Sequence, residues 1–90
     1  MSSTIDLIRE RLEQLHPISL DIQDDSAKHI GHAGAKDGGH YQLNIVSNAF
    51  IGTSRVKRHQ MIYDLVSDLM QTKIHALAIQ AFTEQEFGKS

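Results

Sequence analysis

Histidine is the residue type in this chain best suited to metal chemistry. The 90 residues include six histidines and no cysteine, so imidazole nitrogens are the softest ligands that the chain itself can offer. His75 stands at the head of a predicted strand, IHALAIQAF, and His29 and His32 lie in the glycine-rich segment 25–39. A lone histidine at a strand end is more often a surface residue or a hydrogen-bonded core residue than a ligand. Position alone therefore leaves the role of His75 open.

A zinc site formed by His29, His32 and His40 is conceivable from the ligand type. Zinc ligands usually come at short, regular spacings on a structured frame, and no such spacing links these three histidines. We expect His32 and His40 to be solvated loop residues, or His40 to be the first residue of the strand that follows. The sequence therefore does not favour a zinc site.

A second candidate site is a cluster of positive charge that we call the basic turn. It consists of Arg55, Lys57, Arg58 and His59. These residues lie at the N-terminal end of a predicted helix, where the helix dipole disfavours positive charge. Their placement favours an anionic ligand, either the phosphates of nucleic acid or the acidic groups of a protein partner. A solvated helix face, on which Asp64 and Asp68 relieve the charge, explains the pattern equally well.

Other functional classes find little support in the sequence. No G-x-S-x-G elbow, paired-carboxylate site or nucleotide-binding loop organises the Ser, His and Asp residues, which argues against an enzyme. The net charge of −2 gives no global attraction to nucleic acid or to an anionic membrane. The N-terminal segment lacks the apolar core of a signal peptide and no apolar run could span a bilayer, so we expect a cytosolic protein without membrane contact.

The spacing of apolar residues predicts two helices and two strands before residue 72. Strict alternation in residues 17–24 and 40–47 is typical of half-buried strands. An amphipathic helix precedes them, beginning at a cap at Ser3 or Thr4 and ending at His16-Pro17, and a second helix covers residues 54–71. The residues expected to face inward are Ile5, Ile8, Leu12 and Leu15, then Ile18, Leu20 and Ile22, then Tyr41, Leu43 and Ile45, then Ile62, Leu65, Val66, Leu69 and Met70.

The last strand, residues 74–82, is apolar on both faces. This pattern indicates either a strand with neighbours on both sides or a small-residue face beneath helices. We expect Leu77 and Ile79 to share a buried side with His75, and a capping box formed by Thr83 and Glu86 to open a short final helix. The order α-β-β-α-β-α predicts one α+β domain, residues 1–90, with helices on one face of a three-stranded sheet.

Beyond these patterns, the chain resembles the BolA family over nearly its whole length. The motifs that carry the resemblance are DDSAKH with the glycine-rich loop after it, the HY start of the second strand, VSNAFIG, RHQMIYDLV and IHALAIQAFT. Each motif is weak alone, but the combination is specific. The resemblance implies a BolA-like domain similar to the class II KH fold, and two activities: iron–sulfur partnership with monothiol glutaredoxins and nucleic-acid-linked regulation.

The resemblance further implies that His75 is a ligand of a [2Fe–2S] cluster. The second ligand would come from the loop between the first two strands, at His29 or, less favoured, at His32. Imidazoles can replace two thiolates on one iron of such a cluster, and the thiolates would come from a glutaredoxin cysteine and its bound glutathione. The chain is then expected to be a non-enzymatic adaptor for cluster trafficking or iron sensing, and to be a monomer or weak homodimer without cofactor when isolated.

A DNA-binding regulator that uses the basic turn is the alternative function. KH domains clamp phosphates with a GXXG loop between two helices. The segment GHAG, residues 31–34, lies between two predicted strands instead, and the turn at residues 51–54 lacks the second glycine. Few aromatic residues lie near the basic turn, so stacking on single strands is expected to be weak. By resemblance, His59 has a structural or partner-facing role.

Overall fold

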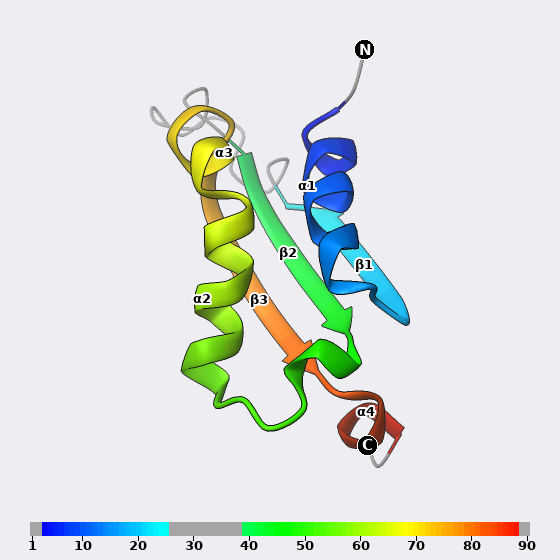
Figure 1. Ribbon diagram of the computed structural model, residues 1–90. Coiled ribbons are helices and arrows are strands. Elements are labelled where there is room, and N and C mark those ends of the chain that lie inside the picture. Colours follow the sequence, from blue (N-terminus) through cyan, green and yellow to red (C-terminus); the bar gives the residue numbers. More distant parts are fainter. Residues whose placement is uncertain (1–2, 26–38, 89–90) are drawn as a thin grey trace.

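Helices pack on one face of a three-stranded sheet, which gives the chain an α+β fold (Figure 1). The computed structural model describes residues 3–25 and 39–88. Within them, the elements in chain order are α1 (Thr4–Leu12), a 3-10 turn (Glu13–Leu15), β1 (Ser19–Asp24), β2 (Gly39–Val46), a second 3-10 turn (Asn48–Phe50), α2 (Arg55–Leu65), α3 (Ser67–Thr72), β3 (Ile74–Phe82) and α4 (Glu84–Gly88).

The sheet has the order β1-β2-β3, with β2 in the centre. β1 pairs antiparallel with β2, and β3 pairs parallel with β2, in registers that place Ile22 opposite Leu43 and Leu43 opposite Ile79. The last strand is therefore an edge strand, and the expectation that it has neighbours on both sides is wrong. The alternative, a small-residue face beneath helices, is not what the structure contains either. Helices α2 and α3 pack along β3, but the small residues Ala76 and Ala78 are exposed and Leu77 and Ala81 are buried.

The core lies between the helices and one face of the sheet, as the apolar spacing predicts. Ile18 is an exception, since it precedes β1 and is 53% exposed. The buried residues from the helices are Ile8, Leu12, Ile62, Val66 and Leu69, and those from the strands are Ile22, Tyr41, Leu43, Ile45, Val46, Ile74, Leu77 and Ala81.

The helix predicted over residues 54–71 is divided in two. Val66, with φ −115° and ψ 17°, separates α2 from α3, and its N–H is shared between the carbonyls of Ile62 and Tyr63. The break turns the chain toward the start of β3.

The cap of the first helix lies where the sequence predicts it, because Ser3 and Asp6 form a capping box on α1. None of the helices in the described ranges has the length and apolar character that crossing a membrane requires.

A β-bulge at the start of β3 decides where His75 lies. Pairing passes from Gly39 opposite Ile74 directly to His40 opposite Ala76, so His75 is an extra residue in β3. The extra residue shifts the alternation: Ile74 and Leu77 are both buried, while His75 and Ala76 between them are exposed. The expectation that His75 shares the buried side of Leu77 is therefore wrong.

We expect Ser47→Ala to destabilise the fold. Ser47 is fully buried, donates its hydroxyl hydrogen to the carbonyl of Leu15 and accepts the N–H of Ala49. The substitution leaves both groups without this partner, which costs about 1–3 kcal/mol of unfolding free energy. Urea unfolding measures the loss, with Ser67→Ala on the exposed start of α3 as the control. Equal stability of the two variants would contradict the role of Ser47.

Candidate functional site

The first candidate site lies at the end of the sheet where β1 ends and β2 and β3 begin. The imidazole rings of His40 and His75 lie side by side there, with centroids 5.2 Å apart and planes tilted by 46°. The N–H of Asp25 donates to the carbonyl of His40 at 2.7 Å, and the N–H of Gly39 donates to the carbonyl of Lys73 at 3.1 Å. Asp25 and Gly39, the described residues on either side of segment 26–38, therefore lie next to the histidine pair.

Gly39 leaves room at this junction for the ring of Tyr41, which would have to shift if position 39 carried a side chain. A Cβ atom at position 39 would lie only 2.5 Å from that ring. Beside the histidine pair is a hollow of about 280 Å³, and its lining includes Asp25, His40, Ala76 and Ala78. The alanines are exposed and small, so they leave space next to the imidazoles. The arrangement can present imidazole nitrogens to an external group, with room for that group to approach.

Only one of the three predicted cluster ligands lies among the residues that the structure describes. His75 is exposed at this end of the sheet, whereas His29 and His32 fall in the segment outside the described residues. Within residues 3–25 and 39–88, no three side chains of the types that bind metal gather into a site. His40, which we expected to be solvated or to begin a strand, is the second residue of β2 and is half-buried beside His75. Parallel pairing of HYQLNIV with ALAIQAF, the residues directly after His75, is the signal that could have placed them together.

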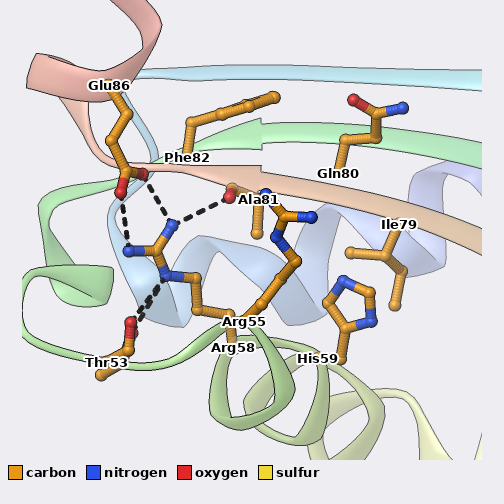
Figure 2. Close-up of a pocket in the computed structure, with 9 residues that line it drawn as sticks. All are labelled: Thr53, Arg55, Arg58, His59, Ile79, Gln80, Ala81, Phe82 and Glu86. Atoms are coloured by element: carbon orange, nitrogen blue, oxygen red, sulfur yellow. Dashed lines mark hydrogen bonds and ion pairs between the residues drawn. The ribbon is translucent and has the colours of Figure 1, made fainter.

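The second candidate site surrounds the basic turn, in which Arg58 is bound inside the fold (Figure 2). Its guanidinium forms two parallel hydrogen bonds with the carboxylate of Glu86, at 2.6 and 3.0 Å. It also donates to the carbonyl of Ala81 at 3.1 Å and to both the carbonyl and the hydroxyl of Thr53 at 3.2 Å. Arg58 is 9% exposed and lies over the ring of Phe50. This arginine therefore joins α2, β3 and α4.

The other members of the basic turn are available to a partner. Arg55 and Lys57 are exposed, His59 is half-buried, and none of their side chains has a hydrogen bond or ion pair with another described residue. Asp68 does not relieve their charge, because it binds Arg11 of α1 through both carboxylate oxygens. The solvated helix face is present, since Arg55, Lys57 and Asp64 are exposed, but the expectation that Asp68 relieves its charge is wrong.

A pocket of about 680 Å³ opens between the start of α2 and the edge strand β3. Arg55 and His59 extend into it from α2, toward the side of β3 that carries Ile79 (Figure 2). The residues that line the pocket are Thr53, Arg55, Arg58, His59, Ile79, Gln80, Ala81, Phe82 and Glu86. The sequence motifs did not indicate this pocket, because its two walls lie more than twenty residues apart in the chain.

The ion pair with Arg58 sets the ionisation of Glu86. Hydrogen bonds from Arg58, and then from the N–H of Thr83 at 2.8 Å, lower the pKa of the Glu86 carboxyl from 4.5 to about 2. The Thr83 hydroxyl accepts the N–H of Glu86 in return, which confirms the predicted capping box. The ionised form of Glu86 is therefore favoured by the folded state.

We expect the stabilisation by Glu86 to be lost in acid. Because the pKa of Glu86 is lower in the folded chain than in the unfolded chain, its contribution is complete above about pH 5 and falls as the pH drops toward 2. Thermal unfolding between pH 7 and pH 3 should show Glu86→Gln less stable than wild type at pH 7, with a difference that narrows in acid. Glu84→Gln, on the exposed first turn of α4, is the control. A difference that stays constant with pH would contradict the ion pair.

Comparison with known proteins places the chain and its fold in one family. Residues 12–86 match the profile of the BolA family, described as BolA-like protein. The chain superposes on the solved BolA domain of SufE1 from Arabidopsis thaliana with a TM-score of 0.80 and 44% identity, covering 96% of this chain and 99% of that one.

Three curated relatives show the same match at the level of sequence. SufE-like protein 1 of Arabidopsis thaliana, chloroplastic/mitochondrial, is 48% identical in an alignment 86 residues long, with 88% of this chain and 23% of that protein covered. Protein BOLA1, chloroplastic, of the same plant is 42% identical, with 88% and 52% covered. The DNA-binding transcriptional regulator BolA of Escherichia coli strain K12 is 34% identical, with 90% and 80% covered. The chain thus spans about a quarter and a half of the first two relatives.

Proposed function

Since the chain belongs to the BolA-like protein family, we propose that it is a non-enzymatic adaptor that binds a monothiol glutaredoxin and shares a [2Fe–2S] cluster with it. The observation that supports this most directly is the exposed position of His75 on a bulge at the end of the sheet. A bulge re-aims a side chain without breaking the rest of the strand. Without the extra residue, the alternation of β3 would direct position 75 toward the helices.

The donor set fits the histidine half of a mixed-ligand cluster. A chain without cysteine offers neutral nitrogen ligands, and two imidazoles on one iron are compatible with a [2Fe–2S] cluster when thiolates hold the other iron. His75 would be one ligand and His29, or His32 in its place, the other, because the described residues on either side of segment 26–38 lie next to the histidine pair. A glutaredoxin cysteine and glutathione would supply the thiolates. Bound in this way, the cluster would supply a redox-active, transferable iron–sulfur unit.

His40 has a supporting role in this proposal. Its ring lies next to that of His75, and its carbonyl fixes Asp25 at the start of the segment that carries His29. His40 therefore limits the orientations open to the His75 ring and anchors the chain toward the second ligand. Ligands held by neighbouring groups in this way bind metal more tightly than free ones.

We expect His75→Ala to remove the shared cluster and leave the fold intact. The side chain is exposed, so its loss should change the unfolding free energy by about 1 kcal/mol or less. Visible circular dichroism of the chain reconstituted with a monothiol glutaredoxin should lose the mixed-ligand spectrum. His75→Cys should restore a cluster with a lower reduction potential, because thiolate donates more charge to iron.

Three controls accompany this experiment. His40→Ala should weaken the cluster without abolishing it, and His29→Ala should weaken it less than His75→Ala does because His32 can substitute. The wild-type chain alone, given iron and sulfide, should remain without a stable cluster, since two imidazoles leave half of the coordination empty. A wild-type spectrum from His75→Ala, or a stable cluster on the isolated chain, would refute the shared-cluster function.

A DNA-binding role is a second candidate, and the uncovered charge of the basic turn favours it. Arg55 and Lys57 are exposed cations, and the Escherichia coli relative is named as a DNA-binding transcriptional regulator. Arg58 cannot contribute without giving up Glu86. Phosphate contacts would therefore rest on two positive side chains near the start of α2.

The double substitution Arg55→Ala with Lys57→Ala tests this role without disturbing Arg58. If both side chains contact phosphates, DNA affinity should fall and the slope of log K against log salt concentration should decrease by about 2. Fluorescence anisotropy with a labelled duplex measures both quantities. The double variant should unfold at the same temperature as wild type. Arg58→Ala would not serve this test, because it leaves Glu86 without its cation and lowers stability. An unchanged salt slope would place DNA binding elsewhere on the molecule.

A further inference from the structure

The outer edge of β3 is open at one residue. The carbonyl of Phe82 accepts a hydrogen bond from the N–H of Ser47, at the end of β2, at 2.8 Å. The main-chain polar groups of Phe82 therefore point inward, toward β2. Main-chain groups alternate in direction along a strand. The carbonyls of Leu77 and Ala81 accordingly point outward, where they accept hydrogen bonds from the Tyr63 hydroxyl and from Arg58, each at 3.1 Å.

By the same alternation, the N–H and the carbonyl of Ile79 point outward between these two bonds. No side chain of the described residues donates to that carbonyl or accepts that N–H. Ile79 is one of the residues that line the 680 Å³ pocket, so a molecule bound in this pocket lies next to Ile79. A donor and an acceptor exposed at a sheet edge are the groups to which an extended peptide can bind as an added strand.

Positive charge borders this open edge. Arg55 and His59 line the pocket and extend toward β3 (Figure 2). Glu86 is the one carboxylate among the lining residues, and Arg58 already holds both of its oxygens. The pocket therefore combines main-chain pairing groups with the unneutralised guanidinium of Arg55 and the imidazole of His59, which favours a peptide that carries a negative side chain.

We propose that this pocket binds a short extended segment of a partner protein through main-chain hydrogen bonds to Ile79, with an acidic side chain of that segment received by Arg55 and His59. A phosphate backbone fits the pocket less well, because it has no hydrogen to donate to the Ile79 carbonyl. Ile79 follows His75 by four residues, or roughly 13 Å along the strand. The peptide site is therefore distinct from the histidine pair and does not depend on a cluster.

The test uses the full-length chain labelled with ¹⁵N and the blocked peptide acetyl-Thr-Val-Glu-Val-Thr-amide, followed by NMR up to a few millimolar peptide. The amide signal of Ile79 should shift in a saturable way, and its hydrogen exchange should slow. Replacing the peptide's Glu by Gln should weaken binding about tenfold, since a charge-assisted bond is lost. No saturable shift at Ile79, or equal binding of the Gln peptide, would overturn the proposal.

Two matched variants separate the pocket from general attraction between charges. Arg55→Gln removes a cation that lines the pocket, whereas Lys57→Gln removes a neighbouring exposed cation that does not. Arg55→Gln should weaken the peptide about tenfold and Lys57→Gln should have little effect. Equal losses would mean that binding is nonspecific and would overturn the site.

A main-chain substitution tests the strand pairing itself. Ile79→Pro removes the outward N–H, and proline is tolerated at an edge strand where the N–H does not bond a neighbouring strand. It should abolish peptide binding, whereas Ile79→Val should preserve it. Binding that survives in a folded Ile79→Pro variant refutes main-chain pairing. If the Ile79→Pro variant does not fold, hydrogen exchange of the wild-type Ile79 amide tests the pairing instead, and an exchange rate that the peptide does not slow would refute it. A single-stranded DNA oligonucleotide is compared in the same measurement. If the DNA protects the Ile79 amide better than the peptide does, the choice of a peptide as the partner is overturned.

Discussion

The burial of one guanidinium constrains the C-terminal half of this protein. A cation taken out of water is tolerated only where its hydrogen-bonding groups find well-placed acceptors. Arg58 meets this condition with acceptors from three places in the chain: the turn before α2, the end of β3, and α4. Thr53 is far in sequence from Ala81 and Glu86, so the arginine fixes the turn before α2 relative to the end of β3 and to α4. It is also one wall of the pocket between α2 and β3.

The engagement of Arg58 divides the basic turn into two kinds of residue. Arg58 is committed to the fold, while Arg55 and Lys57 remain exposed at the same helix end. Sequence spacing cannot separate them, because all of them are positive residues within one and a half turns of helix. Glu86, the partner that makes the difference, lies 28 residues downstream. A cluster of charged residues identified from sequence can therefore contain both residues bound inside the fold and residues exposed to a partner. Only the positions of their long-range hydrogen-bond acceptors separate the two kinds.

Local patterns predicted the elements well, and long-range pairing is what they missed. Alternation located β1 and β2, and the caps at Ser3 and Thr83 follow from side chains within three residues of the helix start. The edge position of β3 and its bulge depend on which strand pairs with β2 and in what register. The contact between His40 and His75 follows from that register. Family resemblance singled out His75, but its exposure comes from a single extra residue in β3.

The side chains that cover β3 carry a consequence for solubility. The strand sequence IHALAIQAF has no charged residue and no proline, which is the composition of segments that assemble into fibrils when their edges are free. The Tyr63 hydroxyl and the Arg58 guanidinium occupy two outward carbonyls, at Leu77 and Ala81. A second copy of the whole strand would have to displace both before it could continue the ladder, whereas a short segment that pairs with Ile79 alone would not. The molecule can thus keep an apolar edge strand at its surface while resisting ordered aggregation.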